Sequence, residues 1–225
     1  MELLCELCPK GCRIQPGQSG ECRIRVNLGD KLVAVTYGYS CAVHVDPIEK
    51  KPVFHFLPGS GTFSIATVGC NLHCKNCQNW EISQTNPEES EASPLPHEQI
   101  PTLARQYNCR SVSYTYTDPV VYYEYTFDSS VAAREAGLKN ILVTAGYINK
   151  KPWEELLEHV DVARIYLKSM SDGFYRDICG ATLKPVLESM VTARTKGAHV
   201  EVVPIRRGTS PSSRLRSTRH AAPLH

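Results

Sequence analysis

The chain has 225 residues, of which 42% are apolar, enough for one hydrophobic core with or without a small satellite. Its formal net charge of +2 depends on five arginines after residue 205, so residues 1–205 carry a net charge of −3. This acidic net charge does not indicate the basic surface that specific nucleic acid binding requires. No run approaches the ~18 apolar residues of a membrane span, and the first residues lack the features of a signal peptide, so we expect a cytoplasmic protein without a membrane partner.

The first segment carries four cysteines, Cys5, Cys8, Cys12 and Cys22, among prolines and glycines. A turn-rich segment this short has too little apolar surface to fold without a cross-link or a metal. In a cytosolic chain, metal ligands are more common than disulfides. We expect the four thiols to share one metal site, for which zinc and an auxiliary iron-sulfur cluster fit the spacing equally well. Free thiols are the alternative, and Cys41 can substitute for one ligand.

A small cap is predicted for the N-terminal part of the chain. Residues 31–36 have the pattern of a strand, and Gly29-Asp30 before them is typical of a hairpin turn. We therefore expect residues 1–57 to form a Cys-rich cap. The two segments that follow the hairpin, 46–52 and 55–60, contain too many prolines for a helix.

A second set of cysteines follows an apolar, β-branched run at residues 63–68, which predicts a strand. Cys70, Cys74 and Cys77 have C-x3-C-x2-C spacing in the loop directly after it. Iron-sulfur clusters are usually held by four cysteines, so three in a compact loop leave one iron with an open coordination position. The alternative is a zinc site with His73 as the fourth ligand. These residues are packed too closely along the chain to suit one tetrahedral ion well.

The rest of the chain alternates between helical and strand patterns after a long polar connection, residues 81–96, which we expect to be functional or disordered. The predicted helices are 97–107, 119–136, 151–160 and 182–196, and the predicted strands are 110–116, 140–144, 162–168 and 198–203. Gly137 and Gly197 stand where helices commonly end. Together with 63–68, this alternation predicts an α/β fold with five parallel strands and right-handed crossovers that curl toward a barrel. Functional residues should then follow the C-terminal ends of the strands.

The cysteine loop, residues 69–80, resembles the signature of the radical S-adenosylmethionine (radical SAM) enzymes. The segments 46–52, 55–60 and 77–83 are similar to those of pyruvate formate-lyase activating enzyme-like proteins, in the branch called the AmmeMemoRadiSam system. The resemblance covers residues 5–203. It implies a partial, open TIM-like (β/α) barrel over residues 58–205 and a 4Fe-4S cluster on Cys70, Cys74 and Cys77 that chelates S-adenosyl-L-methionine. The implied reaction is reductive cleavage to a 5′-deoxyadenosyl radical, which abstracts hydrogen from a protein, as in glycyl-radical activation, or from a small molecule.

The resemblance also assigns residues near the strand ends to the cofactor. Thr117 and Asp118 stand where the family has a Gly-Gly-Glu-Pro turn, and the Asp118 carboxylate would meet the amino group of the cofactor. The alternative is that Asp118 caps the next helix, with proline at its first position. Thr144 matches the threonine of a Thr-Asn-Gly-Tyr segment, and Lys168 matches the lysine of Asp-Leu-Lys near the cofactor carboxylate.

Two positions depart from the family, and two cysteines stand apart. Ala145 replaces the asparagine after Thr144, and Tyr166 replaces the aspartate two residues before Lys168. We expect Cys109 and Cys179 to be buried, inert thiols.

The resemblance implies an electron donor of the flavodoxin or ferredoxin type. A catalytically silent iron-sulfur or zinc-binding module is the alternative function. Residues 206–225 are rich in Arg, Ser and Pro without helix or strand periodicity, so we expect a disordered basic tail after a truncated barrel. The last strand would then be an open edge, which favours self-association.

Overall fold

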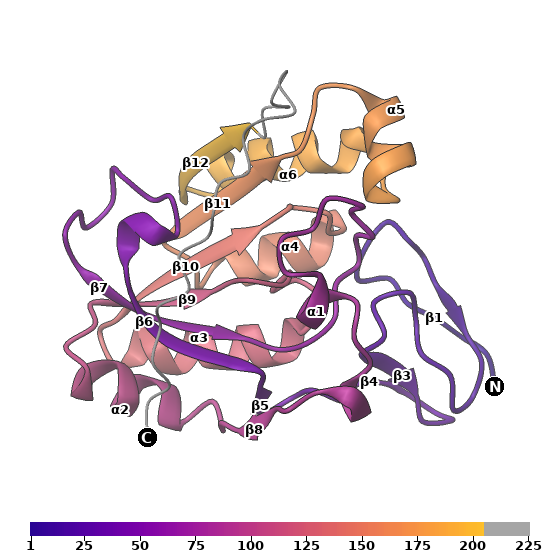
Figure 1. Ribbon diagram of the computed structural model, residues 1–225, viewed down its shortest axis with the longest axis horizontal. Helices are drawn as coiled ribbons and strands as arrows, with labels where there is room; N and C mark the ends of the chain where they lie inside the picture. Colours follow the sequence, from indigo (N-terminus) through magenta and orange to yellow (C-terminus); the bar gives the residue numbers. More distant parts are fainter. Residues whose placement is uncertain (205–225) are drawn as a thin grey trace.

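A six-stranded sheet forms the centre of the protein in a computed structural model that describes residues 1–204 (Figure 1). Its strand order is β12-β11-β10-β9-β7-β6. The parallel strands are β7 (Gly61–Ala66), β9 (Ser111–Tyr114), β10 (Lys139–Thr144), β11 (Val162–Leu167) and β12 (His199–Pro204). This order confirms the predicted α/β fold with a partial barrel of five parallel strands. The predicted tail, 206–225, lies outside the described residues.

Four helices connect the parallel strands: α2 (Gln99–Gln106), α3 (Tyr123–Glu135), α4 (Lys150–Leu157) and α6 (Leu183–Thr195). Alternate strand residues such as Phe63 and Ile65 pack in one large core with helix residues such as Trp153 and Leu156. The indole of Trp153 also donates a hydrogen bond of 2.9 Å to the carbonyl of Ser189 and so joins α4 to α6. One face of the sheet is therefore held by apolar packing, as the periodicity predicts.

The helix ends follow the prediction better than the helix starts do. Gly137 and Gly197 adopt φ values of 77° and 89° directly after α3 and α6, the left-handed conformation that ends helices. In contrast, α3 begins at Tyr123 rather than near residue 119. Asp118 is therefore not the cap of this helix, and that alternative is wrong.

The sixth strand, β6 (Ala42–Pro47), pairs antiparallel with β7 and lies within the range predicted for the cap. Asp46 of this strand is buried and accepts hydrogen bonds from the Lys51 ammonium and the Tyr116 hydroxyl, both at 2.6 Å. A buried charge needs such partners. The segment after β6 is thus fixed to the sheet, and the part of the chain that stands apart as a cap ends before residue 42.

The N-terminal lobe, residues 1–41, consists of short antiparallel pairs and turns at one end of the sheet (Figure 1). β1 (Leu3–Leu4) pairs with β2 (Arg13–Ile14), and β3 (Arg25–Asn27) pairs with β4 (Leu32–Ala34) around the predicted hairpin turn at Gly29. Arg25 forms a bidentate ion pair with Glu124 of α3, at 2.8 and 2.7 Å. The lobe is therefore attached to the helical layer.

The long polar connection contains ordered structure. It begins with the short helix α1 (Trp80–Ser83) and contains β8 (Ser93–Pro94), which pairs with β5 (Tyr39–Ser40) of the lobe. After β11, the helical turn α5 (Asp172–Phe174) continues into a π-helical turn, Tyr175–Cys179. Across residues 1–204, no helix combines the length and the apolar character needed to cross a lipid bilayer.

Candidate functional site

The cysteine loop begins at Gly69, directly after β7 at the C-terminal edge of the parallel strands. Gly69 has a φ of 92°, and a Cβ atom there would lie 2.6 Å from both the Cys22 carbonyl oxygen and Ile24 Cγ2. Only glycine satisfies both conditions. The chain therefore turns into the loop in direct contact with the N-terminal lobe.

The three thiols of the loop are partly exposed, and each sulfur has a polar neighbour. The backbone N–H of Leu72 donates to Cys70 Sγ at 3.4 Å, and the Ser83 hydroxyl lies 3.3 Å from Cys77 Sγ. Burial and the nearby Asp118 carboxylate raise the pKa of Cys70. The pKa of Cys74 is lowered to about 7, chiefly by a hydrogen bond from the thiol of Cys179, with Lys168 adding to the effect.

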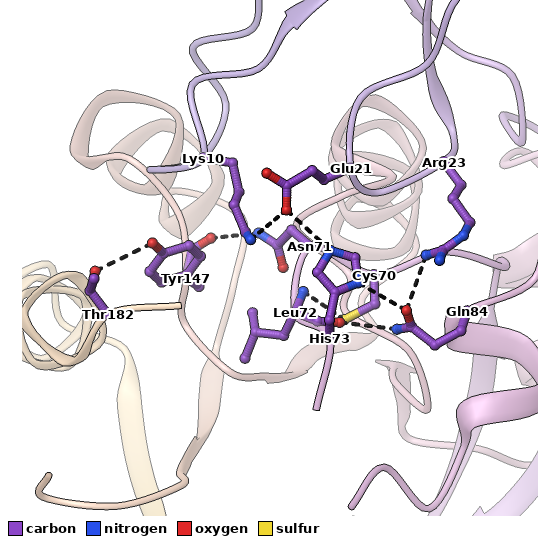
Figure 2. A network of polar contacts seen from close by, with 10 residues as sticks. All are labelled: Lys10, Glu21, Arg23, Cys70, Asn71, Leu72, His73, Gln84, Tyr147 and Thr182. Atoms are coloured by element: carbon purple, nitrogen blue, oxygen red, sulfur yellow. Dashed lines mark hydrogen bonds and ion pairs between the residues drawn. The ribbon is translucent and has the colours of Figure 1, made fainter. Parts of the chain in front are cut away.

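His73 does not point toward the thiols. Its Nδ1 lies 2.9 Å from Gln84 Oε1 and its Nε2 lies 3.2 Å from Glu21 Oε2 (Figure 2). Both ring nitrogens are thus engaged by oxygens, which removes the fourth ligand from the zinc alternative.

Gln84 connects the loop to the N-terminal lobe, as Figure 2 shows. Its amide nitrogen donates to the Leu72 carbonyl at 3.0 Å, and its amide oxygen accepts from Arg23 Nη1 at 3.1 Å. Glu21, in the same lobe, also pairs with Lys10 at 2.5 Å. The loop is therefore held from the side of the lobe by charged and amide groups.

Asp118 and Thr144, which the resemblance assigns to the cofactor, contact each other. The Thr144 hydroxyl donates to Asp118 Oδ1 at 2.6 Å, and the backbone N–H of Ala145 donates to Oδ2 at 2.9 Å. Asp118 is 3% exposed. Its burial raises the carboxyl pKa above the ordinary value, although these hydrogen bonds oppose the effect. The pair thus joins the end of β10 to the segment after β9.

Lys168 and Thr117 occupy different surroundings at the same edge of the sheet. The Thr117 hydroxyl donates to the Thr67 carbonyl at 2.8 Å, which ties the segment after β9 to the end of β7. The Lys168 ammonium lies 4.8 Å from the centre of the Tyr166 ring, and its charge contributes to the lowered pKa of Cys74 and opposes the rise in the pKa of Asp118. A cavity of about 530 Å³ opens beside Lys168, lined also by residues of the segment 169–178.

Three further residues lie at the site, of which the sequence pointed to Asn79, because it flanks the cysteine loop, but not to the contacts of Asn71 and Cys179. Asn71 donates to the Tyr147 carbonyl at 2.7 Å, and Asn79 donates to the Tyr116 carbonyl at 2.6 Å, so two amides tie the loop to neighbouring strand ends. Both asparagines stand within two residues of a loop cysteine, and this proximity in the sequence is the signal that could have indicated their role. Cys179, expected to be inert, lies next to Cys74, and no sequence spacing indicates this because the two residues are far apart in the chain.

The four N-terminal cysteines lie near one another. Cys5 and Cys8 are buried, the charge of Cys22 acts on both thiols, and Cys12 acts on Cys5 as Cys5 acts on Cys8. The side chain of Asn71 also reaches Cys8. Cys41 instead packs against the main core at the start of β6.

Both donor sets consist of thiols, which are common ligands of zinc and of iron-sulfur clusters. In residues 1–204, no three or more His, Cys, Asp or Glu side chains are placed so that they could hold a metal ion as they stand. The loop nevertheless offers three soft thiols, of which Cys70 accepts a backbone N–H and Cys77 lies within hydrogen-bond distance of the Ser83 hydroxyl. This donor set fits an iron-sulfur cluster, whose potential depends on such hydrogen bonds.

Comparison with known proteins identifies the family. The model of the radical SAM superfamily matches residues 64–207. The chain belongs to the radical SAM superfamily. The uncharacterized protein MJ0808 of Methanocaldococcus jannaschii is 47% identical over 198 residues, which are 88% of this chain and 59% of that protein. This radical SAM chain therefore spans a little over half the length of the curated relative.

Two solved structures are similar to part of the chain at low sequence identity. SuiB of Streptococcus suis bound to S-adenosylmethionine is 16% identical, with a TM-score of 0.44 over 62% of this chain and 30% of that one. TYW1 with a lysine-pyruvate adduct bound is 16% identical, with a TM-score of 0.43 over 64% of this chain and 54% of that one.

Proposed function

We propose that this radical SAM chain is an enzyme of the pyruvate formate-lyase activating enzyme-like type, in the AmmeMemoRadiSam branch. Cys70, Cys74 and Cys77 would hold the 4Fe-4S cluster. The observation that carries the proposal is the position of these thiols on one loop at the C-terminal edge of the parallel strands, within electrostatic reach of Asp118 and Lys168. The chemistry supplied by the bound cluster is one electron for the reductive cleavage of S-adenosyl-L-methionine to a 5′-deoxyadenosyl radical.

The side chains around the loop would bind and orient the cofactor. The Lys168 ammonium offers a point charge for a carboxylate beside the cavity that Lys168 lines. Asp118, oriented by Thr144 and Ala145, keeps acceptor capacity for an amino group. Thr117 keeps the ends of β7 and β9 together, which places these groups on a rigid edge.

The partners and the second metal are further parts of the proposal. An electron donor of the flavodoxin or ferredoxin type would reduce the cluster. The radical would abstract hydrogen from a protein, by glycyl-radical activation, or from a small molecule. Cys5, Cys8, Cys12 and Cys22 would hold zinc or an auxiliary iron-sulfur cluster, because they are gathered in one lobe.

Anaerobic reconstitution with iron and sulfide tests the main proposal. The expected result is broad absorption near ~400 nm, the resonance of a reduced cluster, and formation of 5′-deoxyadenosine with a reductant and S-adenosyl-L-methionine. Changing Cys70, Cys74 or Cys77 to Ala should abolish all three signals, whereas Cys109→Ala should keep them. A stable cluster without 5′-deoxyadenosine would instead identify a silent iron-sulfur module, and absence of the absorption would favour zinc.

A further inference from the structure

Cys179 is a buried nucleophile that the proposed function does not use. It lies at the end of the π-helical turn Tyr175–Cys179 and is 0% exposed. Its thiol is in hydrogen-bond contact with the thiol of Cys74. The other two loop cysteines have different neighbours, the Leu72 N–H and the Ser83 hydroxyl. Cys74 is thus the loop cysteine that has a fourth thiol as its partner.

The backbone keeps these two cysteines together. The N–H of His73 donates to the Cys179 carbonyl and the N–H of Lys75 donates to the Ile178 carbonyl, both at 2.9 Å. Gly180 follows with a φ of 63°, and a Cβ atom there would lie 3.5 Å from the His73 side chain. Two hydrogen bonds, one on each side of Cys74, therefore fix the loop against the turn that carries Cys179.

The two thiols differ in access to solvent. Cys74 is partly exposed, whereas Cys179 belongs to the main apolar core. An oxidant in solution meets Cys74 first. Exposed and buried thiols in contact have the arrangement of an attacked and a resolving cysteine.

We propose that Cys74 and Cys179 are a redox modification site, which forms a reversible disulfide when the metal-free protein meets hydrogen peroxide. The Cys74 sulfur attacks one peroxide oxygen, the O–O bond breaks, and a sulfenic acid and one water result. The Cys179 sulfur then attacks the sulfenic sulfur, the S–S bond forms, and the hydroxyl leaves as a second water. The two thiols lose two electrons and peroxide gains them.

The disulfide has a clear consequence for the loop. It stops the oxidation of Cys74 before the sulfinic acid, which thiol reductants do not reverse. It also withholds Cys74 from any metal until a thiol reductant restores it. Cys179 therefore protects the loop while no metal is bound.

Peptide mapping of the full chain tests the proposal. Metal-free protein is treated with one equivalent of hydrogen peroxide, alkylated and digested with trypsin. Cleavage after Lys75 and Arg176 places Cys74, Cys77 and Cys179 on three different peptides. The expected product links the peptide ending at Lys75 to the peptide beginning at Asp177, and it disappears after dithiothreitol. Full alkylation of Cys179, or a link to the Cys77 peptide instead, would overturn the proposal.

Variants identify the sulfurs and the protective effect. Cys70→Ser should keep the link, since Cys70 shares a peptide with Cys74. With two or more equivalents of hydrogen peroxide, the amount that a sulfinic acid requires, Cys74 of the Cys179→Ser variant should reach the sulfinic acid. After reductant, this variant should take up about threefold less iron than the wild type treated in the same way. Cys109→Ser, which removes a buried cysteine elsewhere, is the matched control and should behave as the wild type. Equal iron uptake by Cys179→Ser and the wild type would contradict the protective role, and the wild-type map decides the link even if a variant misfolds.

Discussion

At the scale of single residues, Asp118 shows how a predicted cofactor ligand is also a structural group. Its two oxygens accept from Thr144 and Ala145 of the segment that ends β10, and the side chain is buried. A helix cap at this position would tolerate Asn, but α3 begins at Tyr123 and that reasoning does not hold. The carboxylate is therefore needed for the contact between two strand ends.

We expect Asp118→Ala to lower the free energy of unfolding by about 3 kcal/mol, since the buried carboxylate and the hydrogen bonds that it accepts from Thr144, Ala145 and Val120 are lost. Urea denaturation of the metal-free protein measures this. Asp118→Asn keeps one acceptor and should cost about half as much. Thr144→Val, which removes one donor, is the control, and an unchanged midpoint for all three variants would refute the structural role.

Glu201 on β12 gives a prediction for pH. Burial alone would raise its pKa, but hydrogen bonds from the N–H groups of His55 and Phe54 and from His199 outweigh it, and the pKa lies below the ordinary 4.5. The unfolded chain therefore binds this proton more readily, so the stabilisation is complete above pH 4.5 and is lost as the pH falls below it.

We expect Glu201→Gln to flatten the loss of stability between about pH 5 and pH 3, because the group that takes up the proton is gone. Urea midpoints at several pH values across this range test it. Glu188→Gln, at an exposed position on α6, should keep the slope of the wild type. Parallel slopes for Glu201→Gln and the wild type would show that Glu201 contributes nothing to acid sensitivity.

At the scale of elements, the cysteine loop depends on a close approach of two backbones. Gly69 leaves no room for a Cβ atom beside the Cys22 carbonyl and Ile24. The loop and the N-terminal lobe therefore pack as one unit, and Gln84 and His73 extend the contact along the loop.

We expect Gly69→Ala to lower the free energy of unfolding by about 3 kcal/mol or more. The substitution adds a clash with neighbouring atoms, one of them a backbone carbonyl oxygen, to the strain of a left-handed conformation. Thermal unfolding of the metal-free protein measures it. Gly17→Ala is the matched control, because its φ is 78° and no atom lies within 4 Å of the added carbon. The control should lose only about 1 to 2 kcal/mol. Equal losses of stability for Gly69→Ala and Gly17→Ala would mean that the N-terminal lobe can shift away from residue 69 without loss of free energy.

The sequence predicted most of the elements because their patterns are local. The strands and helices after residue 60 follow hydrophobic periodicity, and the glycines after α3 and α6 mark their ends. β6 was not predicted, because its pairing with β7 is a tertiary contact. The short segment that ends in Pro47 has no local sequence pattern that indicates this pairing. The contact of Cys179 with Cys74 was missed for the same reason, and the metal-binding and cofactor roles of the site residues stay predictions.

At the scale of the whole molecule, Arg25 and Glu124 attach the N-terminal lobe to α3. The Arg25 side chain is 7% exposed and that of Glu124 is 47% exposed. Loss of the glutamate leaves a buried cation without its partner, whereas loss of the arginine leaves a carboxylate that water can solvate. The two ends of this ion pair are therefore not equivalent.

We expect Glu124→Ala to lower the free energy of unfolding by about 1 to 2 kcal/mol more than Arg25→Met does, and to make the N-terminal lobe more accessible to protease. Limited trypsin digestion, with cleavage after Arg13 and Arg23 as the readout, and urea midpoints measure the difference. Glu135→Ala, on the same helix, is the control. A larger effect for Arg25→Met would show that apolar packing of its side chain, rather than the ion pair, holds the lobe.

The direction of β6 also determines which strand pairings would form if this sheet closed into a barrel. Because β6 runs opposite to β7, the two outer strands of the sheet within residues 1–204, β6 and β12, point in opposite directions. A complete (β/α)8 barrel closes with every neighbour parallel. Here, closure onto β6 would make β6 antiparallel to both of its neighbours, β7 and the closing strand, and further parallel strands beside β12 would change the second neighbour without removing either antiparallel pairing.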